Sequence, residues 1–251
     1  MIKCEKGDWS RVDFEISQSR QKSESTGGDV RLVTSTVTSP TLQASIDAFL
    51  KRFKDARHIT FDSVSCSAIL DAHDRTHGSR ILPHYQLDQA KVIVSLGADF
   101  LGTWISPVEF TAAWRSRRVP TEAHPEMSYH VHLEGRMSLT GSNADRRFRV
   151  APDEFGNLFN HLYVQLAEYA GESPPREDLT ASPVPNADLS ALAEQLWNAR
   201  GGSLVLCNSQ DVDVQVLVSA INNLLGNYGK TLDITSPSPQ PQGNDPALIH
   251  I

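Results

Sequence analysis

The sequence is poor in cysteine, and its three cysteines stand far apart. Cys4, Cys66 and Cys207 show no CxxC or comparable close spacing. An iron–sulfur cluster needs about four thiolates with closely spaced members, and a structural zinc site needs about four ligands. We therefore expect this chain to build neither site alone, and the wide spacing does not suggest a disulfide framework.

Long apolar runs and an excess of basic residues are also missing. No stretch approaches about 18 consecutive apolar residues, so the sequence predicts no transmembrane helix. Residues 1–17 contain neither an apolar signal-peptide core nor a twin-arginine motif, so no export signal is visible. The 23 basic and 30 acidic residues give a net charge of −7, which argues against a non-specific nucleic-acid partner. Two basic islands are read as solvated surface: Arg115, Arg117 and Arg118, and the pair Arg146 and Arg147.

What the sequence does contain is an alternation of strand and helix patterns. A chain of 251 residues, 39% of them hydrophobic, can bury a sizeable core and suggests one large or two small domains. The apolar runs Val92–Leu96 and Val131–Leu133 each stop at small and polar residues. Such strands, with helices between them, are typical of an open parallel sheet. The predicted fold class is α/β, with an open, mainly parallel Rossmann-like sheet, flanking helices and the start of a second α/β unit.

Apolar periodicity and turn residues place the elements along the chain. Ser39-Pro40 predicts the start of a helix, and Asp188 is expected to cap another. Strands are expected at 30–33, 58–61, 92–96, 131–134, 148–150 and 204–206, and further helices at 65–75, 105–116, 154–170, 189–199 and 212–226. Composition then divides the chain into a flexible polar lead-in (1–28), a main α/β domain (29–170), a proline-rich linker (171–187), a partial second α/β unit (188–235) and a proline-rich tail (236–251).

The partial second unit begins as the main domain does. Gly201–Leu206 aligns with Gly27–Leu32 at an offset of 174 residues. Duplication and convergence to one βα pattern both remain open, and we favour convergence. One βα start cannot enclose its own core, so Leu224 and its apolar neighbours need burial elsewhere. We expect the helix at 212–226 to pack across the main domain or to mediate self-association, and the chain to be a piece of a longer one.

The candidate site lies where two of the predicted strands end. Ligands of open parallel sheets sit at the carboxyl ends of the strands. If the strands at 92–96 and 131–134 are neighbours, as sequential strands often are, Asp99 and Glu134 share one crevice. The candidate binding residues at this edge are Gly97, Ala98, Asp99, Glu134, Arg136, Ser138 and Thr140.

Four segments then resemble a known family: VRLVTSTVTSPTL (30–42), AKVIVSLGADFLGTWISPVEF (90–110), RMSLTGSNADRRFRVAPDE (136–154) and AINNLLGNYGKT (220–231). They are similar to the molybdopterin-oxidoreductase-like subunit of alternative complex III, a bacterial membrane-associated quinol:electron-acceptor oxidoreductase. The resemblance covers roughly residues 28–235 and is most specific between 90 and 154. It implies membership of the dimethyl-sulfoxide-reductase superfamily, restricted to its central α/β portion.

The resemblance also implies what the strand-end loops once held. In catalytic relatives the first loop reads roughly Gly-Ala/Ser-Asn-Pro and the second Asp-Pro-Arg followed by Thr, and they hold the guanine-dinucleotide arms of the molybdenum cofactor. Here Asp99 replaces the asparagine, Glu134 takes the aspartate position, Gly135 replaces the proline, and Arg136 is kept. A negative charge at Asp99 disfavours an approaching pyrophosphate, and Gly135 loosens the turn. The resemblance therefore predicts a degenerate site and no cofactor in this chain.

The function that follows from the resemblance is a cofactor-free scaffold. Its expected partners are the iron–sulfur, multihaem cytochrome and polytopic membrane subunits of a redox complex. They would hold it at the bacterial cytoplasmic membrane without direct insertion. One alternative is the cofactor-cradling half of a molybdenum oxidoreductase that binds molybdopterin guanine dinucleotide. A second alternative is a stand-alone nucleotide-binding domain.

The histidines suggest metal binding only weakly. His73 and His77 have i, i+4 spacing, but a zinc pair needs a third ligand, for which His58 or His84 is a candidate. Polar surface helices produce such pairs often, so no metal site is predicted. His130 and His132 alternate on one predicted strand, which places both on the same face of the sheet. We expect them at a core or interface position.

Overall fold

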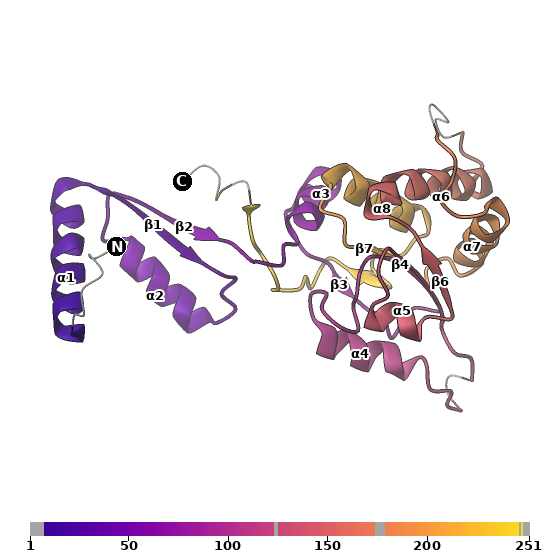
Figure 1. Ribbon diagram of the computed structural model, residues 1–251, viewed down its shortest axis with the longest axis horizontal. Coiled ribbons are helices and arrows are strands. Elements are labelled where there is room, and N and C mark those ends of the chain that lie inside the picture. The colour runs from indigo at the N-terminus through magenta and orange to yellow at the C-terminus, as the bar shows by residue number, and fades with distance from the viewer. Residues whose placement is uncertain (1–7, 123–124, 174–178, 246, 248–251) are drawn as a thin grey trace. The chain divides into compact units, whose positions relative to one another are not determined.

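The computed structural model describes residues 8–122, 125–173, 179–245 and 247. It shows two compact units, one formed by Met1–Val64 with Gly243–Ile251 and the other by Ser65–Gln242. Figure 1 shows the helices and strands of both, with labels on most of them.

The smaller unit pairs two strands in parallel and adds two helices. Strand β1 (Asp29–Thr34) pairs with β2 (Asp55–Thr60) along their full lengths. Helix α1 spans Trp9–Thr26 and α2 spans Pro40–Leu50. Helix α2 begins as predicted, because Ser39 Oγ accepts the backbone N–H of Leu42 (3.3 Å) and proline stands in the first turn. Among its described residues, the buried apolar side chains of this unit are Ile46, Phe53 and Ile59, which make a small core.

The larger unit is built on a four-stranded parallel sheet with the strand order β6-β5-β4-β7. The central β4 (Val92–Leu96) pairs with β5 (Tyr129–Glu134) on one side and β7 (Ser203–Cys207) on the other, and β6 (Arg146–Arg149) lies outside β5. The helices are α3 (Ser67–His77), α4 (Pro107–Ser116), α5 (Leu139–Asn143), α6 (Phe155–Ala170), α7 (Asn186–Asn198) and α8 (Val212–Leu224), with a 3-10 turn at Pro152–Glu154. The short β3 (His84–Tyr85) and β8 (Leu232–Asp233) form an antiparallel pair.

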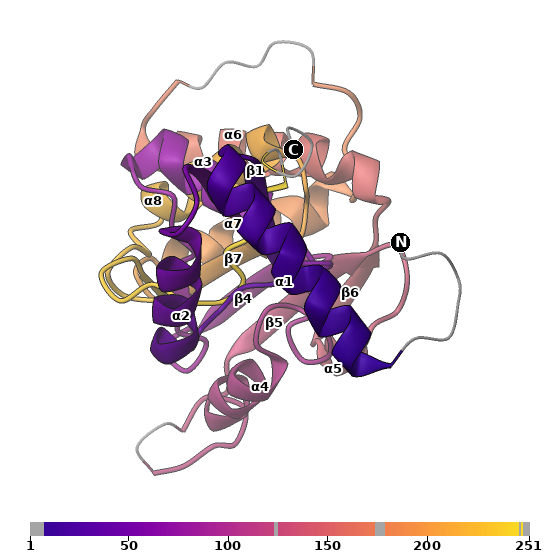
Figure 2. The same ribbon diagram turned by 90° about the vertical axis from the view of Figure 1, so that its left-hand side faces the viewer.

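Alternate residues of the sheet enter two separate apolar cores. Val92, Val94 and Leu96 pack with the buried faces of α6, α7 and α8. Ile93 faces the other way, into a core that includes residues of α3 and α4. Figure 2 shows α4 and α6 on opposite sides of the sheet. Both layers thus cover the central strands, and the predicted α/β class with a parallel sheet is confirmed.

The division of the chain differs from the predicted one in three places. Residues 9–26 of the expected flexible lead-in form helix α1, which Asp8 caps and i, i+4 pairs such as Arg11–Glu15 (3.1 Å) support. Strands β1 and β2 form a sheet of their own, outside the main one. Strand β7 is buried on both faces beside β4, so it completes the main sheet instead of starting a second unit.

The linker and the helix ends differ too. The predicted linker 171–187 runs from the end of α6 into the first turn of α7, and these helices pack together in one unit, so it does not separate two domains. Helix α7 begins at Asn186 after Pro185, and Asp188 is therefore not its cap but a first-turn residue paired with Arg146 (2.9 Å). In the predicted tail, the N–H of Ser238 donates to the carbonyl of Leu82 (2.9 Å). Among the described helices, none combines the length and the apolar character needed to cross a membrane.

Candidate functional site

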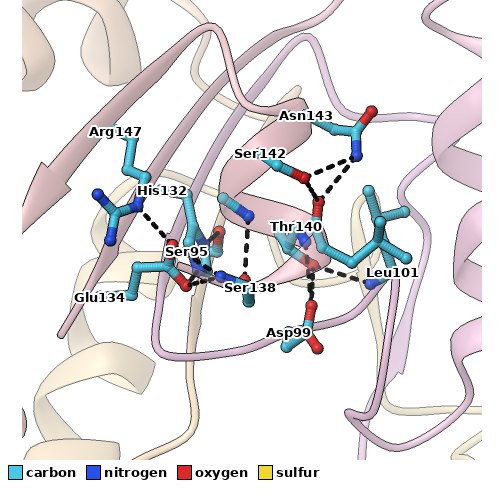
Figure 3. Close-up of polar contacts among 12 residues, drawn as sticks. Ser95, Asp99, Leu101, His132, Glu134, Ser138, Thr140, Ser142, Asn143 and Arg147 are labelled. Carbon is cyan, nitrogen blue, oxygen red and sulfur yellow. Dashed lines mark hydrogen bonds and ion pairs between the residues drawn. The ribbon is translucent and has the colours of Figure 1, made fainter. Parts of the chain in front are cut away.

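The candidate site is built where β4 and β5 end side by side. Leu96 pairs with Leu133 in parallel register, and the N–H of Gly97 donates to the carbonyl of Leu133 (2.8 Å). The predicted adjacency of these strand ends is confirmed. Figure 3 shows Asp99 and Glu134 reaching the short helix α5 from the two strand-end loops.

Asp99 ties the first loop to α5. Its Oδ1 accepts the backbone N–H (3.0 Å) and the hydroxyl (2.8 Å) of Thr140, whose side chain is fully buried. Thr140 Oγ1 in turn accepts the N–H of Leu101 (2.9 Å). The Asp99 carbonyl accepts the N–H groups of Gly102 (3.0 Å) and Thr103 (2.8 Å). The carboxylate therefore cross-links two loops of the chain and does not extend toward a ligand.

Glu134 does the same for the second loop. Its two carboxylate oxygens accept the backbone N–H of Ser138 (3.1 and 3.0 Å), and Oε1 accepts Nε of Arg147 (2.5 Å). The residue is only 4% exposed. Burial alone would raise the pKa of Glu134, but the hydrogen bonds from Arg147 and Ser138 outweigh it and lower the pKa below its usual range. Glu134 is thus an ionised structural group.

Three backbone donors at the start of α5 are occupied by the chain itself. The N–H of Ser138 binds Glu134, that of Thr140 binds Asp99, and that of Gly141 binds Ser138 Oγ (3.0 Å). A Cβ on Gly141 would collide with the Glu134 carboxylate, so only glycine allows this approach. These are the N–H groups that an anionic ligand would need at a helix start.

Gly97 is covered in a similar way. It has a positive φ of 63°, which favours glycine, and a Cβ there would lie 2.9 Å from the ring of Phe155. Ala98 is fully buried beside it. Gly135 and Arg136 are exposed in the second loop. The aromatic ring therefore takes the space through which a ligand would approach the Gly97 backbone.

Molybdopterin guanine dinucleotide, which the resemblance associates with these loops, does not fit them. The glycine that would admit its pyrophosphate faces Phe155, and the helix-start donors bind Asp99 and Glu134. Both carboxylates would also repel a pyrophosphate at short range.

A buried polar chain runs beneath this site, and its serine was not anticipated from the sequence. Ser95 Oγ lies 3.0 Å from Nε2 of His130 and 2.6 Å from Nδ1 of His132. Nε2 of His132 lies 3.1 Å from Oε2 of Glu134. The two histidines and Ser95 are fully buried, so the predicted core position of His130 and His132 is confirmed. The sequence signal that could have revealed this serine is its place within the apolar run 92–96, next to a predicted strand that carries two histidines on one face.

The hydrogen-bond partners of Ser95, His130 and His132 determine which of their atoms carry hydrogen. The Glu134 carboxylate accepts, so His132 Nε2 carries hydrogen and Nδ1 accepts the Ser95 hydroxyl. Ser95 Oγ then accepts Nε2–H of His130. This order leaves Nδ1 of His130 as an acceptor, and among the described residues it has no hydrogen-bond partner. Both imidazoles are neutral in this arrangement.

Burial favours the neutral form of both imidazoles. It lowers the pKa of His130 to about 3; the charge of Arg118 acts in the same direction, and that of Asp145 opposes it. Burial also lowers the pKa of His132, against the opposing charge of Glu134. Ser95, His132 and Glu134 form a serine–histidine–carboxylate series, but the serine is fully buried and no substrate reaches it. We assign the series a structural role, which is to hold β4 and β5 in register.

Among the described residues, the other histidines and the cysteines form no second site. His73 and His77 stack on each other (5.4 Å between ring centres), and His73 Nδ1 binds the carbonyl oxygen of Ile69 (2.8 Å). His84, one proposed third ligand, pairs with Glu109 (2.7 Å), and no group of three or more His, Cys, Asp or Glu suited to a metal occurs within the described ranges. Cys66 and Cys207 are buried thiols that form no disulfide with a described residue, and burial raises the pKa of Cys207 to about 12; Cys4 lies outside the described residues.

The basic islands are mostly used within the fold. Arg118 forms a double contact with Asp145 (2.6 and 2.7 Å), and Asp145 also accepts the N–H of His130 (2.8 Å). Arg147 binds Glu134 and Arg146 binds Asp188. Arg115 is exposed.

Comparison with known proteins finds similarity among solved structures. No family model matches the sequence, and no curated protein matches it. Among solved structures, the chain is similar to acetylene hydratase from Pelobacter acetylenicus, with a TM-score of 0.49 and 12% sequence identity over 91% of this chain. The chain spans 34% of the length of that protein. We draw no argument from a similarity of this size.

Proposed function

We propose that this chain is a cofactor-free, molybdopterin-oxidoreductase-like domain that serves as a scaffold in a membrane-associated quinol:acceptor electron-transfer complex. The proposal rests on the sequence resemblance to the alternative complex III subunit and on one structural observation. That observation is the self-occupied start of α5, where Asp99 and Glu134 bind the N–H groups of Thr140 and Ser138.

A scaffold needs surface for partners, and the same edge of the sheet offers it. Met137 and Leu139 flank Ser138 and are 63% and 55% exposed. These two side chains, on the loop that leads into α5, are the proposed partner-facing surface. The proposed partners are the iron–sulfur, multihaem cytochrome and polytopic membrane subunits, which bring the redox centres and hold the domain at the membrane.

The enzyme alternative requires a different arrangement of the residues at this edge of the sheet. A cofactor-cradling half would require the Phe155 ring to leave Gly97 and both carboxylates to release the start of α5. Each hydrogen bond to a charged group contributes about 1.5–3 kcal/mol, so this opening is costly. The stand-alone nucleotide-binding alternative makes the same demand at this edge.

Purification from two sources tests the proposal. The affinity-tagged chain, recovered from detergent-solubilised membranes of its source organism, should bring stoichiometric haem, iron–sulfur and polytopic subunits, identified by absorption spectra and mass spectrometry. Met137→Asp should reduce that recovery severalfold, whereas the matched change Met127→Asp, also exposed (53%) but just before β5, should not.

The chain produced alone should be colourless and contain no stoichiometric iron, molybdenum or pterin. Elemental analysis and pterin fluorescence after acid oxidation measure this. Stoichiometric molybdenum and pterin in the isolated chain would support the enzyme alternative instead. Recovery from membranes without haem or iron–sulfur partners would contradict the scaffold.

A further inference from the structure

Lysine is rare in the larger unit, and both of its lysines lie at one cavity. Between residues 65 and 242 the sequence contains lysine only at Lys91 and Lys230. The two are far apart in the sequence, yet both line a cavity of about 710 Å³, together with Arg200. The fold therefore brings three cationic side chains to one cavity, although the whole chain has a net charge of −7.

The cavity lies at the amino-terminal edge of the sheet, opposite the candidate site. Lys91 directly precedes β4, Tyr129 begins β5, and Gly202 directly precedes β7. The N–H of Lys91 donates to the carbonyl of Gly202 (2.6 Å), and the N–H of Tyr129 donates to the carbonyl of Lys91 (2.8 Å). Main-chain hydrogen bonds between three strand starts thus fix the wall of the cavity.

The three cations lack a neutralising partner. Across the described residues, no ion pair involves Lys91, Arg200 or Lys230, and no described lining residue is acidic. Like charges around one hollow repel each other and create a positive potential that favours an anion. The remaining polar lining groups are amides and a phenol, from Gln89, Gln195, Asn198 and Tyr129.

Two of the cations are also held in place. The Arg200 guanidinium lies over the Trp197 ring (4.2 Å), and its Nη1 donates to the Trp197 carbonyl (2.8 Å). Gly201 has a positive φ of 74°, and the Lys230 ammonium packs where a Cβ of residue 201 would be. A side chain at 201 would therefore strain the backbone and displace Lys230.

We infer that this cavity binds a small organic diphosphate. Three cations match the roughly three negative charges of a diphosphate near pH 7. The cavity volume lies within the range of about 300–1,000 Å³ that is usual for small-molecule sites, and the amides and phenol provide hydrogen bonds for the organic part. This site lies outside the proposed scaffold role and does not depend on it.

Calorimetry on the full chain at low salt tests the inference, with ADP and inorganic pyrophosphate as probes. Both should bind the wild-type protein, and uncharged adenosine should not. Lys91→Ala and Lys230→Ala should each weaken binding by about tenfold or more, because each removes a charge-assisted contact. Arg115→Ala removes the same charge from an exposed position on α4 and should leave affinity within about twofold.

Thermal unfolding provides a second readout. The ligand-free variants should melt close to the wild type because both lysines are exposed. Pyrophosphate should raise the melting temperature of the wild type more than that of either lysine variant. The inference is overturned if neither probe gives heat or a melting shift at millimolar concentration. It is also overturned if Arg115→Ala weakens binding as much as Lys91→Ala, or if adenosine binds as tightly as ADP. None of these outcomes changes the metal, pterin or co-purification results that test the scaffold.

Discussion

At the scale of single residues, Glu134 joins more of the candidate site than any of its neighbours in Figure 3. Its carboxylate accepts hydrogen bonds from Ser138 at the start of α5, from Arg147 of the outer strand and from His132 of the buried imidazole series. A charged hydrogen-bonded group at the centre of a buried network is costly to remove, because its partners are left unsatisfied. Glu134 therefore contributes to stability in proportion to its ionised fraction.

Replacing Glu134 by glutamine should make this contribution visible as a pH dependence. The pKa of Glu134 is lowered in the folded protein, so the stability it confers is present above its ordinary value of 4.5 and is lost as pH falls through the folded-state pKa. At pH 7, Glu134→Gln should lower the free energy of unfolding by about 1–3 kcal/mol. Urea unfolding from pH 7 to pH 3 should show this difference narrowing below pH 4.5.

The exposed Glu172→Gln provides the control and should leave the free energy of unfolding within about 0.5 kcal/mol of the wild type at every pH. A difference between wild type and Glu134→Gln that stays constant from pH 7 to pH 3 would contradict an ionised structural role.

At the scale of elements, the apolar residues of helix α8 are buried against other elements of the larger unit, because one strand and one helix cannot enclose a core by themselves. It packs against α3, α6 and β7, and Ile221 is fully buried in the core that it shares with α6 and α7. Leu224 packs on the margin of that core. Of the two outcomes expected from the sequence, packing across the sheet unit is the one observed.

Leu224→Asp should therefore lower the melting temperature. The change places a charge against an apolar core, and a loss of about 2 kcal/mol corresponds to about 4–8 °C for a unit of this size. Asn223→Asp introduces a charge one residue earlier at an exposed position of the same helix and should shift melting little. Differential scanning calorimetry and sedimentation velocity measure the two effects. If Leu224→Asp keeps both the wild-type melting temperature and sedimentation, α8 is not a packed element.

At the scale of the whole molecule, the two units differ in how they are stabilised. Both large apolar cores consist of residues between Cys66 and Leu232, within the larger unit. The smaller unit has few buried apolar side chains among its described residues and a sheet of two strands, which is marginal by itself. Stability thus resides mainly in Ser65–Gln242.

A chain limited to residues 65–242 should fold independently. Because both cores are complete within it, its thermal transition should be cooperative and within about 4 °C of the main transition of the full chain, a difference of about 1 kcal/mol. Near-ultraviolet circular dichroism should keep the signal of the buried Trp104. A broad transition with no near-ultraviolet signal would show that the smaller unit is required for folding.

The sequence by itself determined the local elements and several of their relations. Apolar runs and helical periodicity depend on neighbouring residues, so the strand Val92–Leu96, its adjacency to the strand that ends at Glu134, and the shared face of His130 and His132 were predictable. The helix at 9–26 was missed because its polar surface lacks the apolar stripe that marks most helices.

Only the tertiary structure decided which distant groups meet. The sequence could place Asp99 and Glu134 at one edge, but the occupation of the start of α5 by both carboxylates and the Phe155 ring over Gly97 depend on how the loops pack. The position of β7 beside β4, and with it the meeting of Lys91 and Lys230 at one cavity, follows from strand order. Strand order is selected by burial of apolar faces between residues far apart in the chain, and local periodicity carries no information on that pairing.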